Sequence, residues 1–108
     1  MITLEQVEIA LQYLADTDEA LAKAKGEQEY AKHNAKVQYS IAFIEAAGKS
    51  VADRTARAQT DPAYEKAQQR FRDAVYDVSL ISTKRKSAEL TCDLWKCINA
   101  ARGRGQII

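Results

Sequence analysis

The stretch Thr60-Asp61-Pro62-Ala63-Tyr64 decides how the chain folds, because it marks the start of a helix more clearly than any other part of the sequence. Asp61 suits the N-cap position, where its carboxylate can accept hydrogen bonds from the free backbone N–H groups of the first turn. Pro62 suits the first helical position, where its missing N–H is harmless. After this start, apolar residues recur at helical spacing with no internal Gly or Pro, which predicts a helix over about 62–102. The glycine-rich segment 103–108 is expected to be a flexible tail.

Two further helices are predicted upstream of this start. Thr3 and Gln6 fit a capping box, and the apolar residues that follow predict a helix over about 3–25. A lysine-rich turn and Gly26 then resemble a helix end, so we expect a break there. The apolar pattern resumes and predicts a second, longer helix over about 28–58.

These elements predict an all-α protein of one domain, residues 1–108. The helices over about 28–58 and 62–102 should form an antiparallel hairpin, with Gly48 at a position where another helix can approach closely. The short N-terminal helix covers only part of the hairpin, so self-association into an oligomeric bundle or ring is expected. The alternative is a bent three-helix bundle whose third helix kinks near Lys84-Arg85-Lys86.

Composition supports a thin core. The chain has 108 residues, of which 46% are hydrophobic and 29% charged, but only two Phe, one Trp and five Tyr are present. Large side chains are therefore too few to fill a thick monomeric core. The sequence contains no run of about 18 apolar residues, and its N-terminus is neither basic nor strongly apolar, so neither a membrane span nor a signal peptide is expected. We expect a cytoplasmic protein.

No group of residues suggests catalysis, a metal site or a cofactor. Cys92 and Cys97 are five apart on a predicted helix, so they project from different faces and are expected to be buried thiols. His33 is the only histidine and is expected to lie on a solvated helix surface. The glycines form no phosphate-binding loop. The sequence therefore predicts a protein that is not an enzyme.

Charge is distributed unevenly along the chain. Residues 1–29 carry seven acidic and two basic side chains, whereas residues 30–108 carry fourteen basic and eight acidic ones. Basic residues gather on either side of the predicted hairpin turn, where they could neutralise the phosphates of a nucleic acid. An ordinary solvated helix face is the alternative explanation. The candidate DNA-binding residues are Lys49, Arg54, Arg57, Lys66 and Arg70.

Aromatic residues could add stacking surfaces for unpaired bases. Tyr64 and Trp95 fall on the apolar stripe of the third helix and are expected in the core. Tyr39 and Tyr76 are the better candidates for exposed aromatic rings.

Four segments between Tyr30 and about Gly105 carry a resemblance to a known family. They are Tyr30-Ala31-Lys32-His33-Asn34-Ala35-Lys36, Lys49-Ser50-Val51-Ala52-Asp53-Arg54-Thr55-Ala56-Arg57, Tyr64-Glu65-Lys66 and Leu94-Trp95-Lys96-Cys97-Ile98-Asn99-Ala100-Ala101-Arg102-Gly103. In these segments the sequence resembles the phage UvsY recombination-mediator family, whose members load a recombinase onto single-stranded DNA already coated by another protein.

The resemblance implies a non-catalytic protein that binds single-stranded DNA in the cytoplasm of a bacterial host. It implies that Arg54 and Arg57 contact the strand, with Lys49 nearby, and that subunits assemble through the third helix. Its partners would be single-stranded DNA, a recombinase and a single-strand-binding protein. The alternative is a protein-binding module without a nucleic-acid role, such as a phage-encoded inhibitor or a coiled-coil adaptor, which the near-neutral net charge of +1 favours.

Overall fold

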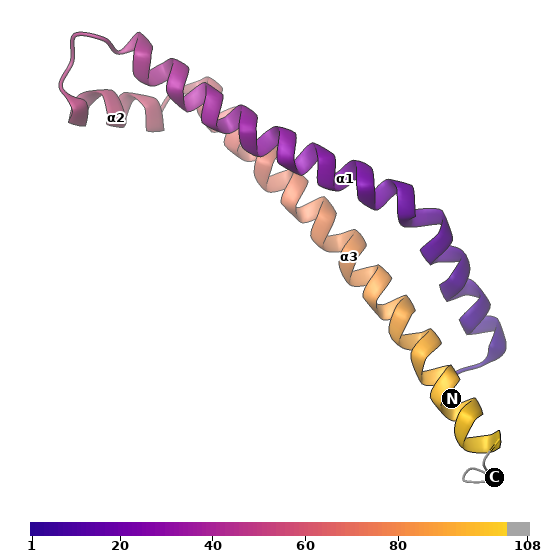
Figure 1. Cartoon of the computed structure of the whole chain (residues 1–108). Helices are drawn as coiled ribbons and strands as arrows, with labels where there is room; N and C mark the ends of the chain where they lie inside the picture. The colour runs from indigo at the N-terminus through magenta and orange to yellow at the C-terminus, as the bar shows by residue number, and fades with distance from the viewer. Residues whose placement is uncertain (104–108) are drawn as a thin grey trace. The chain divides into compact units, whose positions relative to one another are not determined.

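Every regular element in residues 1–103, the part described by this computed structural model, is an α-helix (Figure 1). Helix α1 spans Leu4–Glu45, α2 spans Val51–Gln59 and α3 spans Pro62–Gly103. The predicted all-α class is therefore confirmed. The predicted tail begins at the last residue of α3, and its residues 104–108 lie outside the described part of the chain.

The expected helix end at Gly26 is wrong, because α1 continues through it for another 19 residues to Glu45. A glycine inside a helix costs only about 1 kcal/mol relative to alanine. The flanking residues 20–25 and 27–32 are mostly Ala, Lys, Glu and Gln, which are strong helix formers and outweigh that cost. The first two predicted helices are therefore largely one helix, and there is no separate short N-terminal helix.

The chain breaks instead at Gly48, inside the helix predicted over about 28–58. Gly48 has a φ of 89°, the left-handed conformation that glycine adopts readily after a helix end. Ser50 then caps α2, since its Oγ accepts a hydrogen bond from the Asp53 N–H at 3.2 Å. No atom would lie within 4 Å of a Cβ placed on Gly48, so the expected close helix approach at this residue is also wrong.

Two of the three predicted helix starts are confirmed, whereas the start predicted at about residue 28 is wrong because it lies inside α1. Thr3 and Gln6 form a reciprocal capping box, with the Thr3 N–H donating to Gln6 Oε1 at 2.9 Å and the Gln6 N–H donating to Thr3 Oγ1 at 3.2 Å. Asp61 caps α3, because its Oδ2 accepts a hydrogen bond from the Tyr64 N–H at 3.1 Å. Helix α3 begins at Pro62 and runs without interruption through residues 84–86.

The contacts divide the chain into two compact units. Unit 1 combines Met1–Ala22 with the residues from Ser79 onward. In this unit the start of α1 packs against the end of α3. The core consists of Val7, Ala10, Ala88 and Cys92, with Ile2, Tyr13, Leu14 and Trp95 packed around it. Trp95, expected in the core, packs against it and is only half-buried.

Unit 2 is the continuous segment Lys23–Val78, in which the end of α1 packs against the start of α3. Its buried hydrophobic residues are all alanines: Ala31, Ala35, Ala42, Ala46, Ala58, Ala67 and Ala74. Such small side chains let two helices approach closely and leave the larger residues at the edges of the contact. Tyr64, expected in the core, is therefore only half-buried.

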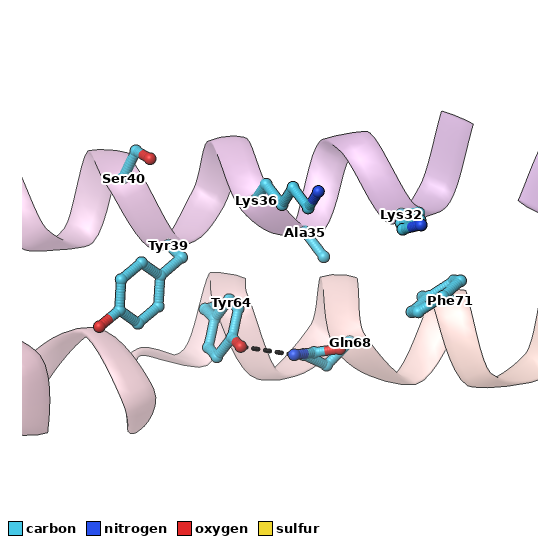
Figure 2. Close-up of a pocket in the computed structure, with 8 residues that line it drawn as sticks. All are labelled: Lys32, Ala35, Lys36, Tyr39, Ser40, Tyr64, Gln68 and Phe71. Atoms are coloured by element: carbon cyan, nitrogen blue, oxygen red, sulfur yellow. Dashed lines mark hydrogen bonds between the residues drawn. The ribbon is translucent and has the colours of Figure 1, made fainter. Parts of the chain in front are cut away.

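In each unit α1 and α3 pack side by side in opposite directions, as expected for a helical hairpin (Figures 1 and 2). The hairpin helices are α1 and α3 rather than the predicted pair over about 28–58 and 62–102. No helix within residues 1–103 is long and apolar enough to cross a membrane.

The predictions for five single side chains have mixed outcomes. His33 lies on an exposed helix surface, as expected. Cys92 is buried, but the prediction is wrong for Cys97, which is exposed. Tyr76 is 65% exposed as predicted, whereas Tyr39 is half-buried because it lies at the contact between α1 and α3.

Candidate nucleic-acid interface

Three of the five predicted DNA-binding residues are exposed cations of unit 2 that form no ion pair within the described residues. Lys49 lies in the turn between α1 and α2, Arg57 lies on α2, and Lys66 lies on the second turn of α3. The ion pairs in residues 1–103 involve other side chains. A phosphate could therefore bind any of these three cations without displacing a carboxylate.

Local sequence explains why these cations face outward. The turn at Gly48 separates α1 from α2 and leaves Lys49 outside both helices. Helix α2 has only nine residues and buries one of them, Ala58. Its neighbour Arg57 is therefore directed to the surface. At the end of α2 the Thr60 Oγ1 donates a hydrogen bond to the Ala56 carbonyl at 3.0 Å.

Arg54 is positioned differently from Arg57, although both lie on α2. Its Nε donates a hydrogen bond to the Phe43 carbonyl at 3.2 Å, and its guanidinium carbon lies 4.4 Å from the centre of the Phe43 ring. These contacts attach α2 to the end of α1. The residue is half-buried, and its role in DNA binding stays a prediction.

Arg70 forms a cross-helix ion pair in unit 2. Its Nε donates to Glu27 Oε1 at 3.0 Å, which joins α3 to α1, and its guanidinium lies 5.2 Å from the centre of the Tyr30 ring. Both charged side chains are about half exposed. A phosphate at Arg70 would compete with Glu27, so this residue is a weaker candidate than Lys49, Arg57 and Lys66, and its role also stays a prediction.

Sequence reasoning missed two lysines as candidate site residues. Lys32 and Lys36 line a groove between α1 and α3, together with Tyr39, Tyr64 and Phe71 (Figure 2). The sequence did contain a pattern that predicts the α1 side of this groove. Along α1, spacings of four, three and four residues separate Lys32, Lys36, Tyr39 and Phe43. That spacing places them on one face of a helix.

The charge of residues 30–72 favours the binding of a polyanion. Residues 30–72 carry eight basic and four acidic side chains. The local field therefore attracts phosphates although the net charge of the whole chain is only +1. In residues 1–103 there is no group of His, Cys, Asp and Glu side chains that could hold a metal ion.

Comparisons of the chain with protein-family models, curated proteins and solved structures give no significant match.

Proposed function

We propose that this chain is a non-catalytic protein that binds single-stranded DNA and acts as a recombination mediator. The observation that carries the proposal is the presence of three exposed cations in unit 2, Lys49, Arg57 and Lys66, that form no ion pair within residues 1–103. Binding of phosphate to such cations releases condensed counterions from the strand, which makes affinity strongly dependent on salt. Arg54 and Arg70 would add to this surface where a strand competes for their present contacts.

The chain would act as a homo-oligomer that assembles through α3. In unit 1, Ala88 and Cys92 on α3 face the core, whereas Leu80, Leu90 and Leu94 are 41%, 53% and 53% exposed. Residues 80, 90 and 94 differ by ten and four positions, so they lie on one side of the helix. We call these three leucines the outer stripe of α3. A second copy would cover it and remove apolar area from water.

Oligomerisation would also raise the affinity for a strand. Each exposed cation of one chain contributes little alone. Linked copies hold further sites near a strand that is already bound, so each later contact forms at a high effective concentration. A recombinase and a single-strand-binding protein are the partners proposed on the basis of the family resemblance. The acidic segment 1–29 is a candidate surface for one of them.

The second candidate function is a protein-binding module without a nucleic-acid role. The outer stripe of α3 favours it, because an apolar helix face is also a docking surface for a helix of another protein. The two candidates differ in whether the cations of unit 2 bind phosphate.

The test measures fluorescence anisotropy of a labelled single strand over a range of salt concentrations. We expect binding that weakens with salt. We also expect the variant with Lys49→Ala, Arg57→Ala and Lys66→Ala to flatten the slope of log affinity against log salt by about 2, since each phosphate contact contributes about 0.7. The matched control carries Lys84→Ala, Lys86→Ala and Lys96→Ala, which removes three exposed cations from unit 1 and should change the slope less.

Either of two results would overturn the DNA-binding proposal: no binding to the strand at low salt, or equal slopes for the two triple variants. Light scattering on the same samples tests the oligomer, because a mass of one chain would exclude assembly through the outer stripe. No strand binding together with a mass of several chains would leave the protein-binding module.

A further inference from the structure

An open groove in unit 2 combines aromatic rings with lysines. It lies between α1 and α3 and has a volume of about 480 Å³, which is within the usual range of about 300–1,000 Å³ for ligand sites. Figure 2 shows the rings of Tyr39 and Tyr64 lying next to each other between the two helices, with Phe71 further along α3. The groove is lined by Lys32, Ala35, Lys36, Tyr39, Ser40, Tyr64, Gln68 and Phe71.

The alanines of unit 2 explain why these rings remain accessible. Ala35 and Ala67 are buried in the contact, and such small side chains leave the larger rings at its edge. Tyr39 and Tyr64 meet edge to face with ring centres 5.3 Å apart, and both are half-buried. The Tyr64 hydroxyl accepts a hydrogen bond from the Gln68 amide, which fixes the position of that ring. The rings are thus held in place while part of their surface faces the groove.

The aromatic surface continues beyond the groove towards α2. A neighbouring hollow shares Tyr39 and Ser40 and adds Phe43 and Ile44. The Tyr39 and Phe43 rings are stacked, with centres 6.4 Å apart and planes inclined by 21°. Arg54 lies over the Phe43 ring and gives this end of the surface a positive charge. Several flat apolar groups could therefore bind in succession along α1.

The groove has a clear charge preference. Two of its eight lining residues, Lys32 and Lys36, are exposed lysines, and none is Asp or Glu. Neither lysine forms an ion pair within the described residues. They lie four residues apart on α1, so their like charges repel slightly, and an anion bound between them would relieve that repulsion. A ligand with flat rings and negative charges matches both features of the groove.

We propose that this groove stacks unpaired bases of a single strand on Tyr39 and Tyr64, while Lys32 and Lys36 bind the adjacent phosphates. The inference rests on the proposed function, because it assumes that the strand reaches unit 2, but it adds a base-binding site to the phosphate-binding cations. Stacking on aromatic rings accepts every base, since each base has an aromatic face. The bound strand would therefore be held by its bases as well as by its backbone, with little sequence preference.

The test compares two labelled strands of equal length and charge, oligothymidine and a strand of abasic residues. Wild-type protein should bind oligothymidine more tightly, by between about fivefold and about 150-fold for each stacked base. The Tyr39→Leu, Tyr64→Leu double variant keeps apolar side chains and removes the rings, so it should lose that preference. The control is Tyr76→Leu, which removes a ring of unit 2 that is 65% exposed and does not line the groove.

The outcomes separate this inference from the proposed function. If no strand binds at low salt, both proposals fail. If the wild-type protein binds the two strands equally, only the base-stacking site fails. If the Tyr76→Leu control loses the preference and the double variant keeps it, the bases stack elsewhere. If oligothymidine and the abasic strand bind equally while an acidic peptide competes for the groove, its occupant is a protein segment.

Crosslinking provides a test that needs no variant. A strand containing 5-iododeoxyuridine is irradiated with wild-type protein, and the modified peptides are identified by mass spectrometry. Adducts are expected on the peptides that carry Tyr39, Tyr64 or Phe71. Adducts confined to Tyr76 or Trp95, which lie outside the groove, would overturn the proposal.

Discussion

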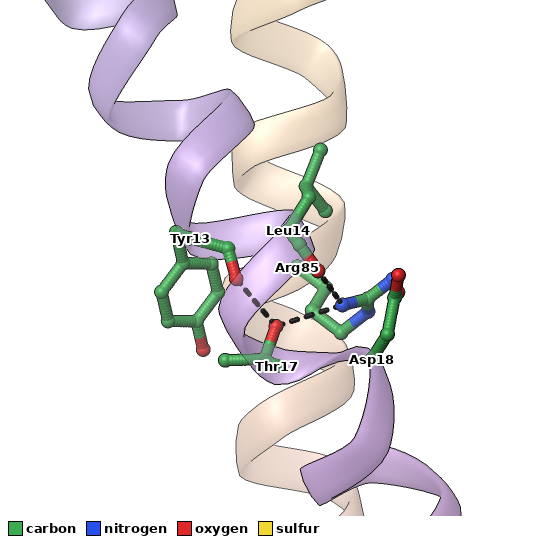
Figure 3. A network of polar contacts seen from close by, with 5 residues as sticks. All are labelled: Tyr13, Leu14, Thr17, Asp18 and Arg85. Carbon is green, nitrogen blue, oxygen red and sulfur yellow. Dashed lines mark hydrogen bonds and ion pairs between the residues drawn. The ribbon is translucent and has the colours of Figure 1, made fainter.

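The two units join α1 to α3 through arginines that are held in very different ways. In unit 1, Arg85 has a side chain that is only 15% exposed, and it reaches from α3 to α1 (Figure 3). Its Nη1 donates to the Leu14 carbonyl at 2.8 Å and to Thr17 Oγ1 at 2.7 Å, and its Nη2 donates to Asp18 Oδ1 at 2.6 Å. In unit 2, Arg70 and Glu27 form an ion pair in which both side chains are about half exposed.

The comparison shows that the role of a cation depends on its burial and on the number of its acceptors. Arg85 donates to a backbone carbonyl and a hydroxyl that lie in a partly buried contact, so its loss removes these charge-assisted hydrogen bonds. Removal of the Arg70 side chain breaks only a solvent-screened ion pair and a contact with the Tyr30 ring. Unit 1 therefore joins its helices through a largely buried arginine, whereas unit 2 packs through alanines and adds an exposed ion pair.

The largest expected effect is a loss of stability on replacing Arg85. Arg85→Ala removes three hydrogen bonds from a cation and leaves the Leu14 carbonyl and Thr17 Oγ1 without this donor. We expect the free energy of unfolding to fall by about 2–3 kcal/mol. The measurement is urea denaturation followed by far-UV circular dichroism, at one protein concentration because self-association would change the apparent stability.

Arg70→Ala is the matched variant in unit 2. Exposed ion pairs contribute about 0–1 kcal/mol, so its expected loss is smaller than that of Arg85→Ala. Equal losses for the two variants would contradict the distinction between the units. A larger loss for Arg70→Ala would reverse it.

The starts of α1 and α3 could be predicted from the sequence because capping is local, whereas the start of α2 after Ser50 was missed. The capping side chains of Thr3 and Asp61 bond to backbone groups three residues away, and their identity is sufficient to predict the contact. Helix ends could not be predicted equally well. Gly26 and Gly48 both follow a helical pattern, and the sequence alone does not show which of them takes a positive φ.

The candidate site could be predicted only in part, for a related reason. Lys49, Arg57 and Lys66 lie close in sequence to the start of α3 at Pro62, so their place near the hairpin turn follows from that start. Contacts across α1 and α3 depend instead on the alignment of two helices that α2 and its flanking turns separate in sequence. The sequence therefore did not show that Arg70 meets Glu27, or that Lys32 and Lys36 border aromatic rings from α3.

The two glycines of unit 2 give the next largest effects, and the effects should have opposite signs. Gly48→Ala forces a Cβ into the left-handed region and should cost about 1–2 kcal/mol. Gly26→Ala places a better helix former inside α1, where a Cβ meets no atom within 4 Å, and should stabilise the protein by about 1 kcal/mol. Thermal unfolding of both variants measures the two shifts.

This pair tests the conformation of the turn at Gly48 and the continuity of α1 at Gly26. Destabilisation by Gly26→Ala would contradict a continuous α1, and a neutral Gly48→Ala would show that the turn adopts another backbone conformation.

The smallest expected effects on stability come from Arg54 and Arg57 on α2. Arg54 is expected to stabilise the fold, and Arg57 is expected to bind the strand. Arg54→Ala removes the hydrogen bond to the Phe43 carbonyl and the contact with its ring, and should reduce the free energy of unfolding by about 1 kcal/mol. Arg57→Ala removes an exposed side chain and should change it by less than about 0.5 kcal/mol. Denaturation is measured together with single-strand anisotropy on both variants.

Stability and single-strand affinity should respond differently in the Arg54 and Arg57 variants. Arg57→Ala is expected to weaken single-strand binding at unchanged stability, because its guanidinium has no partner to lose within the described residues. A variant of Arg54 that lost stability but kept its salt slope would assign that arginine to the fold, as Arg85 is assigned in unit 1. If Arg57→Ala instead lost stability without losing affinity, the exposed cations of α2 would have no part in binding the strand.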